Sequence, residues 1–261
     1  MPVFPQVGPN LVLTQRPYTT RLSYRTEVND MESGRRYSLK LFGAGFDNYP
    51  TGPLSRFTVN YPCITDDEVT VLETFFHSVK GRYGSFIFLD PGGNLLIESE
   101  DLSAASWTKS GATIGAWAAD PFSGLRARPI SGGSVSASVC PDGGVAGYVF
   151  CFSVWLKAAA PTTVTLTFDS TAKTFAIGTS WVRRCISKVA VGDGPIVASV
   201  AGAVSLFGAQ VSPMLGEGGY MKSPGNCGYH KNCRLDTDEF TVTKLGPNQN
   251  SLQLPVAEYF A

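Results

Sequence analysis

Short runs in which apolar and polar residues alternate dominate the sequence, and they restrict the chain to antiparallel β-structure. The run "RRYSLKLF" alternates in this way, and "RFTVNY" repeats the pattern with Phe57, Val59 and Tyr61 as its apolar members. A period of two with one apolar face is typical of strands that bury one side. Near the end of the chain, "DEFTVTKLG" and "SLQLPVAEY" resume the alternation. We therefore expect a mainly β protein.

One segment departs from this period and predicts a helix over about residues 65–80. Thr65 and Glu68 stand in the T-x-x-E relation of a capping box, and acidic residues occupy the first turn, where the helix dipole favours negative charge. An apolar stripe follows at spacings of three and four: Val69, Leu72, Phe75, Phe76 and Val79. Lys80 and Gly81 indicate the end of the helix, with glycine as the cap.

The next strand, "SFIFLD", is almost entirely apolar and is expected to be central or buried on both faces. It stops at Pro91-Gly92-Gly93, after which the chain is rich in Ala, Ser, Gly and Thr. Strand patterns recur there in "YVFCFSVWLKA", "TTVTLTFDS", "WVRRCISKVAV" and "AVSLFGAQV", without a helix pattern of useful length. Strands at this spacing are typical of a β-sandwich or jelly roll.

Glycine-rich segments at both ends of this middle stretch suggest that it is inserted into the first domain. Insertions are tolerated where two surface points of the backbone lie close together. The expected organisation is a β-sandwich or barrel domain with one helix, made of residues 1–93 and 223–261, and an inserted antiparallel jelly-roll domain, residues 94–222. Two consecutive domains with a C-terminal tail are the alternative that the pattern leaves open.

The charge balance argues against polyanionic partners. Lys plus Arg and Asp plus Glu number 21 each, so no net field attracts nucleic acid or an anionic membrane. The longest apolar stretches are shorter than the roughly 20 residues that a membrane helix needs, and "MPVFPQVGPN" lacks the features of a secretory signal. We expect a soluble protein without a membrane span and without a nucleic-acid partner.

The six cysteines are scattered singly and are expected to be free, mostly buried thiols. In "CGYHKNC", Cys227, His230 and Cys233 have a spacing that could offer three ligands to zinc or iron. A structural zinc site usually has four protein ligands; the fourth is missing locally, and Cys63 could approach from elsewhere in the chain. The favoured interpretation is incidental loop residues, with no metal and no cofactor.

Several elements in order resemble the distal tail or minor tail proteins of long-tailed bacteriophages and gene transfer agents. They are the "VFP" start, "SGR" before a strand, and the run "LETFFHSVKGRYGSFIFLDP", and the closing "NCRLDTDEFTVTKLGPNQNSLQLPVAEYF" resembles the C-terminal end of that family. The resemblance covers about the first ninety and the last thirty-five residues. It implies a domain completed by both ends of the chain, which favours the insertion.

The middle of the chain resembles the carbohydrate-binding-like jelly-roll modules that phage tail and tail-fibre proteins often carry. The matching segments are "NLLIESEDLSAASWTKSGATI", "YVFCFSVWLKA", "WVRR" and "SLFGAQVSP", within residues 94–222. Two segments depart from the pattern of those modules: "ADPFSG" replaces a Pro-Asp-Gly segment, and "GGYMKSPG" replaces a Tyr-Ile-Pro ending. These departures concern the ligand more than the fold.

The candidate ligand contacts are Trp117 and Asp120. Trp117 lies in "GATIGAWAADPF", a small-residue stretch expected at a loop or strand edge, where an indole could stack on a sugar ring while Asp120 fixes its orientation. The alternative is an exposed tryptophan without a ligand. Trp107, Trp155 and Trp181 match the tryptophans of the module and are expected to fill a core.

No catalytic constellation is recognisable in the sequence. Only two histidines are present, and the motifs G-x-S-x-G, H-E-x-x-H and G-x-x-x-x-G-K are missing. Grouped carboxylates at residues 98–101 and 236–239 are expected to be solvated surface acids, because neighbours in sequence do not make a two-carboxylate cleft. No catalytic residue is assigned, and the protein is not expected to be an enzyme.

The family resemblance implies a structural protein of a phage tail tip or baseplate, assembled in the host cytoplasm and located in the virion. It would form a ring, most often a hexamer, that joins the tail tube protein to tail hub or tip proteins. The Gly/Pro loop 43–53 and the N-terminal "PVFPQVGPNLVL" are candidate arms for such contacts, or else segments packed on their own domain. The inserted module would project outward and contact host surface polysaccharide. The alternatives are a free lectin-like protein and a tail-associated glycan hydrolase that uses a carboxylate such as Asp120 or Glu217.

Overall fold

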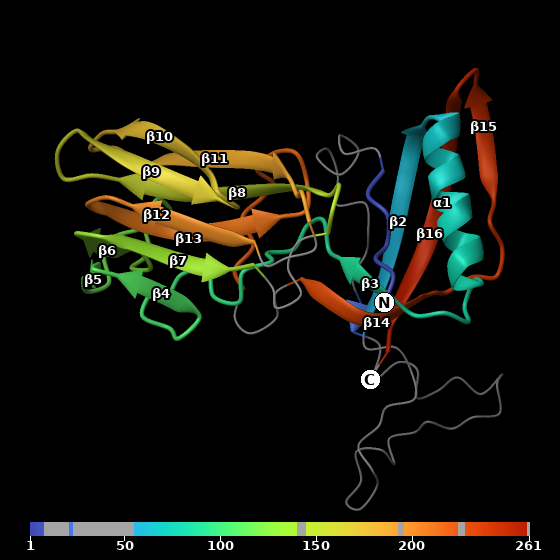
Figure 1. Ribbon diagram of the computed structural model, residues 1–261, viewed down its shortest axis with the longest axis horizontal. Coiled ribbons are helices and arrows are strands. Elements are labelled where there is room, and N and C mark those ends of the chain that lie inside the picture. Colours follow the sequence, from blue (N-terminus) through green and yellow to red (C-terminus); the bar gives the residue numbers. More distant parts are fainter. Residues whose placement is uncertain (8–20, 23–54, 140–144, 193–195, 224–227, 260–261) are drawn as a thin grey trace, which may run out of the picture. The chain divides into compact units, whose positions relative to one another are not determined.

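The structure is a computed structural model in which residues 1–7, 21–22, 55–139, 145–192, 196–223 and 228–259 are described (Figure 1). The chain divides into two compact units. The discontinuous unit consists of Met1–Leu89 and His230–Ala261, and the central unit is Asp90–Tyr229. The sequence pattern had placed these junctions at 93/94 and 222/223. The strand expected in "RRYSLKLF" and the loop 43–53 lie outside the described residues.

The discontinuous unit is built on a sheet with the strand order β1-β2-β16-β14-β3, and β15 also pairs with β16. Its strands are β1 (Arg21–Leu22), β2 (Ser55–Ile64), β3 (Phe86–Leu89), β14 (Tyr229–Leu235), β15 (Val242–Gly246) and β16 (Gln249–Glu258). The last strand in the chain, β16, therefore lies between β2 and β14. Because it occupies the middle of the sheet, the first ninety residues cannot complete this sheet by themselves.

Helix α1 (Asp66–Val79) covers the apolar face of this sheet. Its capping box is formed as the sequence predicted, with Thr65 as N-cap and reciprocal hydrogen bonds to Glu68. The helix ends at Lys80 and Gly81, as the sequence predicted: both are left-handed, with φ of 57° and 58°, and the Gly81 N–H donates to the Phe76 carbonyl at 3.1 Å. Phe75 contacts Phe86 at 5.1 Å between ring centroids. At 14 residues, α1 is too short and too polar to span a membrane. It is the single α-helix within the described residues.

The N-terminal residues 2–7 pack on their own unit. Val3 forms a parallel bridge with Ile87, and Phe4 is buried with its ring 5.3 Å from that of Phe75. This contact covers the free side of β3, the last strand in the sheet order. The strand is therefore largely buried, as its apolar sequence indicated, although it is not central.

The central unit is a sandwich of two five-stranded antiparallel sheets. The β9 sheet has the order β10-β9-β12-β7-β4, and the β8 sheet has the order β11-β8-β13-β6-β5. The strands are β4 (Trp107–Ser110), β5 (Thr113–Ile114), β6 (Arg128–Ser131), β7 (Ser134–Ser138), β8 (Val149–Lys157), β9 (Thr162–Phe168), β10 (Thr171–Ile177), β11 (Val182–Val189), β12 (Val197–Ala201) and β13 (Val204–Ser212). The four strand patterns named from the sequence correspond to β8, β9, β11 and β13.

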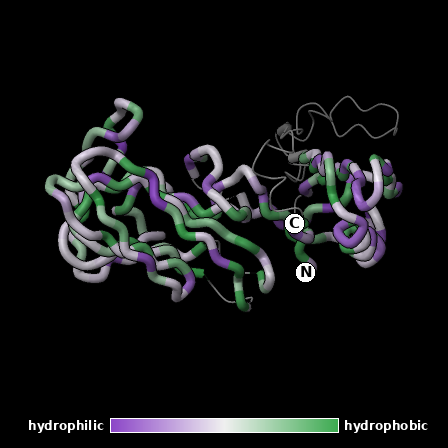
Figure 2. The backbone as a smooth tube through the Cα atoms, turned by 90° about the horizontal axis from the view of Figure 1, so that it is seen from above, coloured by the Kyte–Doolittle hydropathy of each residue, from purple (hydrophilic) through white to green (hydrophobic). Residues whose placement is uncertain are grey.

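The core of the central unit lies between the two sheets. Phe152 of β8 and Phe168 of β9 are buried with their ring centroids 6.0 Å apart. Trp107 belongs to this core, as expected, with 2% of its surface exposed. Hydrophobic and hydrophilic positions interleave along the strands (Figure 2). The mainly β fold with antiparallel sheets is thus the one that the alternating pattern predicted.

Candidate functional site

The outward face of the β8 sheet includes nine side chains that form three rows. Phe152 and Val154 of β8 are fully buried between the sheets, so the side chains that alternate with them point outward. The registers of β8 with β11 and β13 place these outward side chains beside those of the neighbouring strands. The rows are Arg183–Trp155–Phe207, Cys185–Ser153–Gln210 and Ser187–Cys151–Ser212.

The first row forms the centre of an aromatic cluster. Trp155 lies 5.8 Å from Phe207, 5.6 Å from Tyr220 and 5.6 Å from Phe122, measured between ring centroids. The Arg183 guanidinium stacks over the indole at 4.2 Å. The expectation that Trp155 fills the core was therefore wrong: it faces outward and is half-buried, because its neighbours in β8 alternate with it.

Residues 117–127, here called the Trp117 hairpin, connect β5 and β6 and expose three large apolar side chains. Ala118 and Ala127 pair through two backbone hydrogen bonds of 2.8 and 3.1 Å. The exposed fractions are 47% for Trp117, 57% for Phe122 and 72% for Leu125. Exposed apolar groups gathered on one short element are typical of a contact surface.

Asp120 fixes the shape of this hairpin. One carboxylate oxygen accepts hydrogen bonds from the backbone N–H of Phe122 (2.7 Å) and Gly124 (3.1 Å), and the other accepts from Arg126 Nε (2.7 Å). Burial raises the pKa of this carboxyl, but the hydrogen bonds from Arg126 and the two amides outweigh it and hold the pKa below its usual value. Asp120 thus positions the hairpin, and a direct contact of its carboxylate with a ligand stays a prediction.

Trp117 is held from one side by a second arginine. The Arg128 guanidinium lies 4.4 Å from the centre of the indole ring and pairs with Asp101 at 3.6 Å. Because the Arg128 side chain is only 12% exposed, this stack orients the indole while leaving about half of its surface in solvent. A flat apolar surface with a fixed orientation is suited to stacking against a ring-shaped ligand.

Beside the aromatic cluster, Glu100 is the centre of a buried polar network. Its carboxylate accepts a hydrogen bond from the Tyr220 hydroxyl at 2.9 Å and pairs with Lys222 at 2.9 Å and with Arg126 at 3.5 Å. Burial raises the pKa of Tyr220, which keeps the hydroxyl protonated as a donor. The expectation of a solvated acid is wrong for Glu100, which is 4% exposed.

The acids within residues 236–239, the other group of carboxylates noted in the sequence, contact Arg82 in the discontinuous unit. Arg82, just after α1, approaches Asp236 at 3.9 Å and Asp238 at 3.8 Å, and its guanidinium donates to the Asp236 carbonyl at 2.8 Å. These contacts join the end of α1 to the segment after β14. The carboxylates are partly exposed, and each is balanced by the same cation.

The residues of the C-x-x-H-x-x-C motif have separate partners where the structure describes them. His230 Nδ1 lies 2.9 Å from Glu258 Oε2, and Cys233 is buried with its Sγ 3.7 Å from the His230 carbonyl. Burial raises the pKa of the Cys233 thiol, which disfavours the thiolate that a metal needs. Cys227 lies outside the described residues. No group of three candidate ligands occurs within the described ranges.

Four cysteines in the described part of the chain are free, as expected. Cys151 and Cys233 are buried and Cys185 is half-buried, whereas Cys63 is exposed. The exposure of Cys63 differs from the buried state that the sequence suggested. It lies on β2 near the end of the strand.

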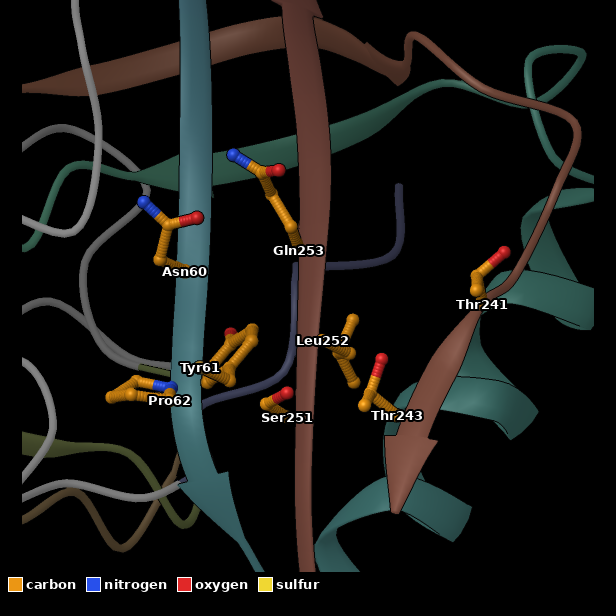
Figure 3. Close-up of a pocket in the computed structure, with 8 residues that line it drawn as sticks. All are labelled: Asn60, Tyr61, Pro62, Thr241, Thr243, Ser251, Leu252 and Gln253. Atoms are coloured by element: carbon orange, nitrogen blue, oxygen red, sulfur yellow. The ribbon is translucent and has the colours of Figure 1, made fainter. Parts of the chain in front are cut away.

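The discontinuous unit carries a groove of about 510 Å³ on its sheet (Figure 3). Its wall residues come from β2, β16 and the β15 segment: Asn60, Tyr61, Pro62, Thr241, Thr243, Ser251, Leu252 and Gln253. The polar lining consists of carboxamides and hydroxyls without a charged group. Because Tyr61 is 4% exposed, the groove offers no open aromatic face for stacking.

No protein-family model matches the chain, and no curated protein matches it. Among solved structures, the C-terminal family 22 carbohydrate-binding module of Clostridium thermocellum Xyn10B is similar over 49% of this chain and 98% of its own, with 17% identity and a TM-score of 0.39. The xylan-binding CBM22-1 domain of Paenibacillus barcinonensis Xyn10C matches 48% of this chain and 97% of its own, with 17% identity and a TM-score of 0.36.

The enzymatically active domain of tailspike protein 4 from bacteriophage CBA120 is similar over 44% of this chain and 21% of that chain. Its identity is 12% and its TM-score 0.32. At these identities and TM-scores, the likenesses leave the family and the ligand of this chain open.

Proposed function

We propose that the central unit binds carbohydrate without cleaving it. The observation that carries the proposal is the Trp117 stack: a half-exposed indole whose orientation is set by the buried Arg128 guanidinium. An exposed tryptophan costs solvation free energy unless a partner covers it, and the apolar C–H face of a sugar ring is a suitable partner. Phe122 and Trp155 provide further aromatic surface on the same unit.

A neutral glycan fits the charges of this region better than an acidic one. Arg126 is balanced by Asp120 and Glu100, and Arg128 is balanced by Asp101. Lys222 also pairs with Glu100, and the charge of Glu217 acts on Arg183. Four carboxylates thus match these four cations and leave no surplus positive charge among them to attract carboxylated or sulfated sugars. Recognition would then depend on stacking and on hydrogen bonds to hydroxyl groups.

Binding without hydrolysis is proposed because Asp120, one of the two candidate acids, and the neighbouring Glu100 are already engaged, while the other candidate, Glu217, is exposed. Asp120 accepts three hydrogen bonds within its own hairpin, and Glu100 is enclosed by Tyr220, Lys222 and Arg126. A glycosidase requires one carboxylic acid and one carboxylate on opposite sides of a sugar. Because Asp120 and Glu100 are each held by other residues, a structural role is favoured for both carboxylates.

For the discontinuous unit we propose assembly into a ring, the hexamer implied by the resemblance to phage tail proteins, between tail tube and tail hub or tip proteins in the virion. Support comes from that resemblance and from the split unit, in which β16 fills the middle of a sheet begun by β2. Such an arrangement lets a module be carried without interrupting the assembling body. The alternative is a lectin-like monomer with the same glycan site.

Two measurements on the full-length chain test these proposals. A glycan array followed by affinity electrophoresis in soluble polysaccharides tests binding, and Trp117→Ala should strongly reduce the retardation. Tyr83→Ala removes an aromatic side chain that is 78% exposed in the discontinuous unit, and it serves as the matched control. Light scattering after gel filtration tests assembly: a ring-sized mass supports the tail proposal, and a monomer supports the lectin-like alternative.

A further inference from the structure

Residues 213–223, here called the strap, cover the β8 and β13 members of two of the three rows on the outward face of the β8 sheet, whereas Cys185 of β11 is half-buried and Ser187 is exposed. Ser153, Gln210, Cys151 and Ser212 belong to these rows, and each is at most 2% exposed. Outward side chains of a sandwich usually contact water, so their burial requires a cover. The covered surface is polar, unlike the apolar core on the inner side of the same sheet.

The strap is attached to the rows mainly through its backbone. Gln210 Nε2 donates to the Gly219 carbonyl at 3.2 Å, and Gln210 Oε1 accepts from the Met221 N–H at 3.1 Å. Arg183 donates to the Gly218 carbonyl at 2.6 Å, and the Ser187 hydroxyl donates to the Leu215 carbonyl. The middle of the strap is thus held by hydrogen bonds that water can replace.

Apolar anchors lie at the ends of the strap and not in its middle. Met214 is 4% exposed at one end, and Tyr220 packs on Trp155 at the other. Between them, "LGEGG" contains three glycines, and Leu215 is 47% exposed. Segments that bury few apolar groups open at lower free energy than the core does.

The surface under the strap has the chemistry of a sugar site. Ser153, Gln210 and Arg183 supply donors and acceptors next to the Trp155 indole. Within the described residues, Arg183 Nε is buried without a hydrogen-bond partner. A buried donor in this state is costly and gains from a ligand that can accept its hydrogen bond.

We propose that the strap is a hinged cover that controls access to the glycan site. In the closed arrangement only the Trp155 row and the Trp117 hairpin are available. When the middle of the strap lifts, the Gln210 and Cys151 rows extend the aromatic row into a longer site with polar groups. This inference rests on the proposed glycan binding, but the opening itself can be measured without any ligand.

Cysteine labelling of the full-length chain tests the opening, because Cys151 is buried beneath the strap, whereas Cys185 in the neighbouring row is half-buried. Labelling is followed site by site by mass spectrometry, with exposed Cys63 as the fast reference and buried Cys233 as the reference for unfolding of the other unit. Ser187→Ala removes one strap contact and should accelerate labelling of Cys151 by about two- to tenfold, with a smaller effect on half-buried Cys185. Ser136→Ala, on the outward face of the β9 sheet, is the control and should leave both rates unchanged.

The direction of this effect separates opening from altered thiol chemistry. Burial raises the pKa of the Cys151 thiol, and a hydrogen bond with Ser187 acts in the opposite direction. Losing that hydroxyl would by itself raise the pKa of the Cys151 thiol and slow the labelling, so acceleration reports opening.

A second variant, Gly219→Ala, should have the opposite effect on labelling. A Cβ on Gly219 meets no atom within 4 Å, so the closed strap accepts it. Because alanine restricts the backbone of the open strap, labelling should slow by about two- to fivefold.

Low urea concentrations distinguish local from global opening. Lifting of the strap exposes little surface, so labelling of Cys151 and Cys185 should be nearly independent of urea below the unfolding transition. The proposal is overturned if Cys151 labels only with the urea dependence of global unfolding and neither variant changes its rate.

Glycan-binding measurements on the wild type and the two variants separate this inference from the proposed function. Soluble xylan, mixed-linkage β-glucan and galactomannan are tested against wild type, Ser187→Ala and Gly219→Ala by affinity electrophoresis. Stronger retardation of Ser187→Ala and weaker retardation of Gly219→Ala support control by the strap. If no glycan binds, the proposed function fails, while labelling still decides whether the strap opens. If glycans bind the wild type and both variants equally, control of access by the strap is excluded.

Discussion

Gly93 and Gly228 lie in backbone contact at the two ends of the central unit. A Cβ placed on Gly93 would stand 3.1 Å from the Gly228 Cα, and the N–H of Asp90 donates to the Gly228 carbonyl at 2.9 Å. The incoming and outgoing chain segments of the unit are thus adjacent. Such closeness is what an inserted domain requires, because the host chain then needs to span only a short gap.

Gly228→Ala should destabilise the central unit by about 1–2 kcal/mol. Gly228 has a φ of +65°, and an added Cβ would meet the backbone of Gly93 and Asn94 at 3.2 and 3.3 Å. Urea unfolding followed by circular dichroism measures the change. Gly178→Ala is the matched control, because its Cβ would meet nothing within 4 Å, and an equal effect of both substitutions would contradict the argument.

Residues 90–229 expressed alone should fold as a cooperative unit. The two sheets of the sandwich and their shared core are contained within this range, and its ends meet at the Gly93–Gly228 contact. A sigmoidal urea transition and dispersed amide resonances are the expected result. A fragment that shows no cooperative transition would mean that the central unit needs the rest of the chain to fold.

Trp117→Ala should weaken glycan affinity about tenfold or more, with little change in stability because the indole is 47% exposed. Arg128→Met should produce a smaller loss, since it removes the cation stacked at 4.4 Å but keeps an unbranched side chain beside the ring. Isothermal titration with the best-retained polysaccharide measures both. Unchanged affinity in Trp117→Ala would place the ligand elsewhere.

Asp120→Asn should cost about 1–3 kcal/mol of stability at pH 7, because it replaces a buried carboxylate that pairs with Arg126 and accepts two backbone hydrogen bonds. The pKa of Asp120 is lowered in the folded protein, so its stabilisation is present above the ordinary aspartate pKa and is lost as the pH falls through the lower folded value. The difference between wild type and variant should therefore shrink as unfolding is measured progressively below pH 4. A difference that is constant with pH would exclude the charge as its cause.

Local sequence patterns predicted the elements of this protein well. The T-x-x-E box located the start of α1 at Thr65, and the alternation in "RFTVNY" identified the residues that β2 buries. The same alternation also predicts that Trp155 points outward. Phe152 and Val154 of β8 are apolar and even-numbered, and odd-numbered Trp155 lies on the opposite face of the strand. The expectation of a core position was wrong for Trp155, because this period, and not the residue type, decides on which face of β8 a side chain lies.

The sequence by itself determined which residues form strands, where the helix begins and which side of each strand is apolar, because these depend on neighbours a few positions apart. Only the tertiary structure decided that Arg128 backs Trp117, that Asp120 closes the hairpin on Arg126, and that the strap covers Gln210 and Cys151. These contacts depend on the register between strands and on the path of segments tens of residues apart. Contacts of this kind produce no repeating pattern in a single sequence, because they form, and contribute free energy, only when the sheets have assembled.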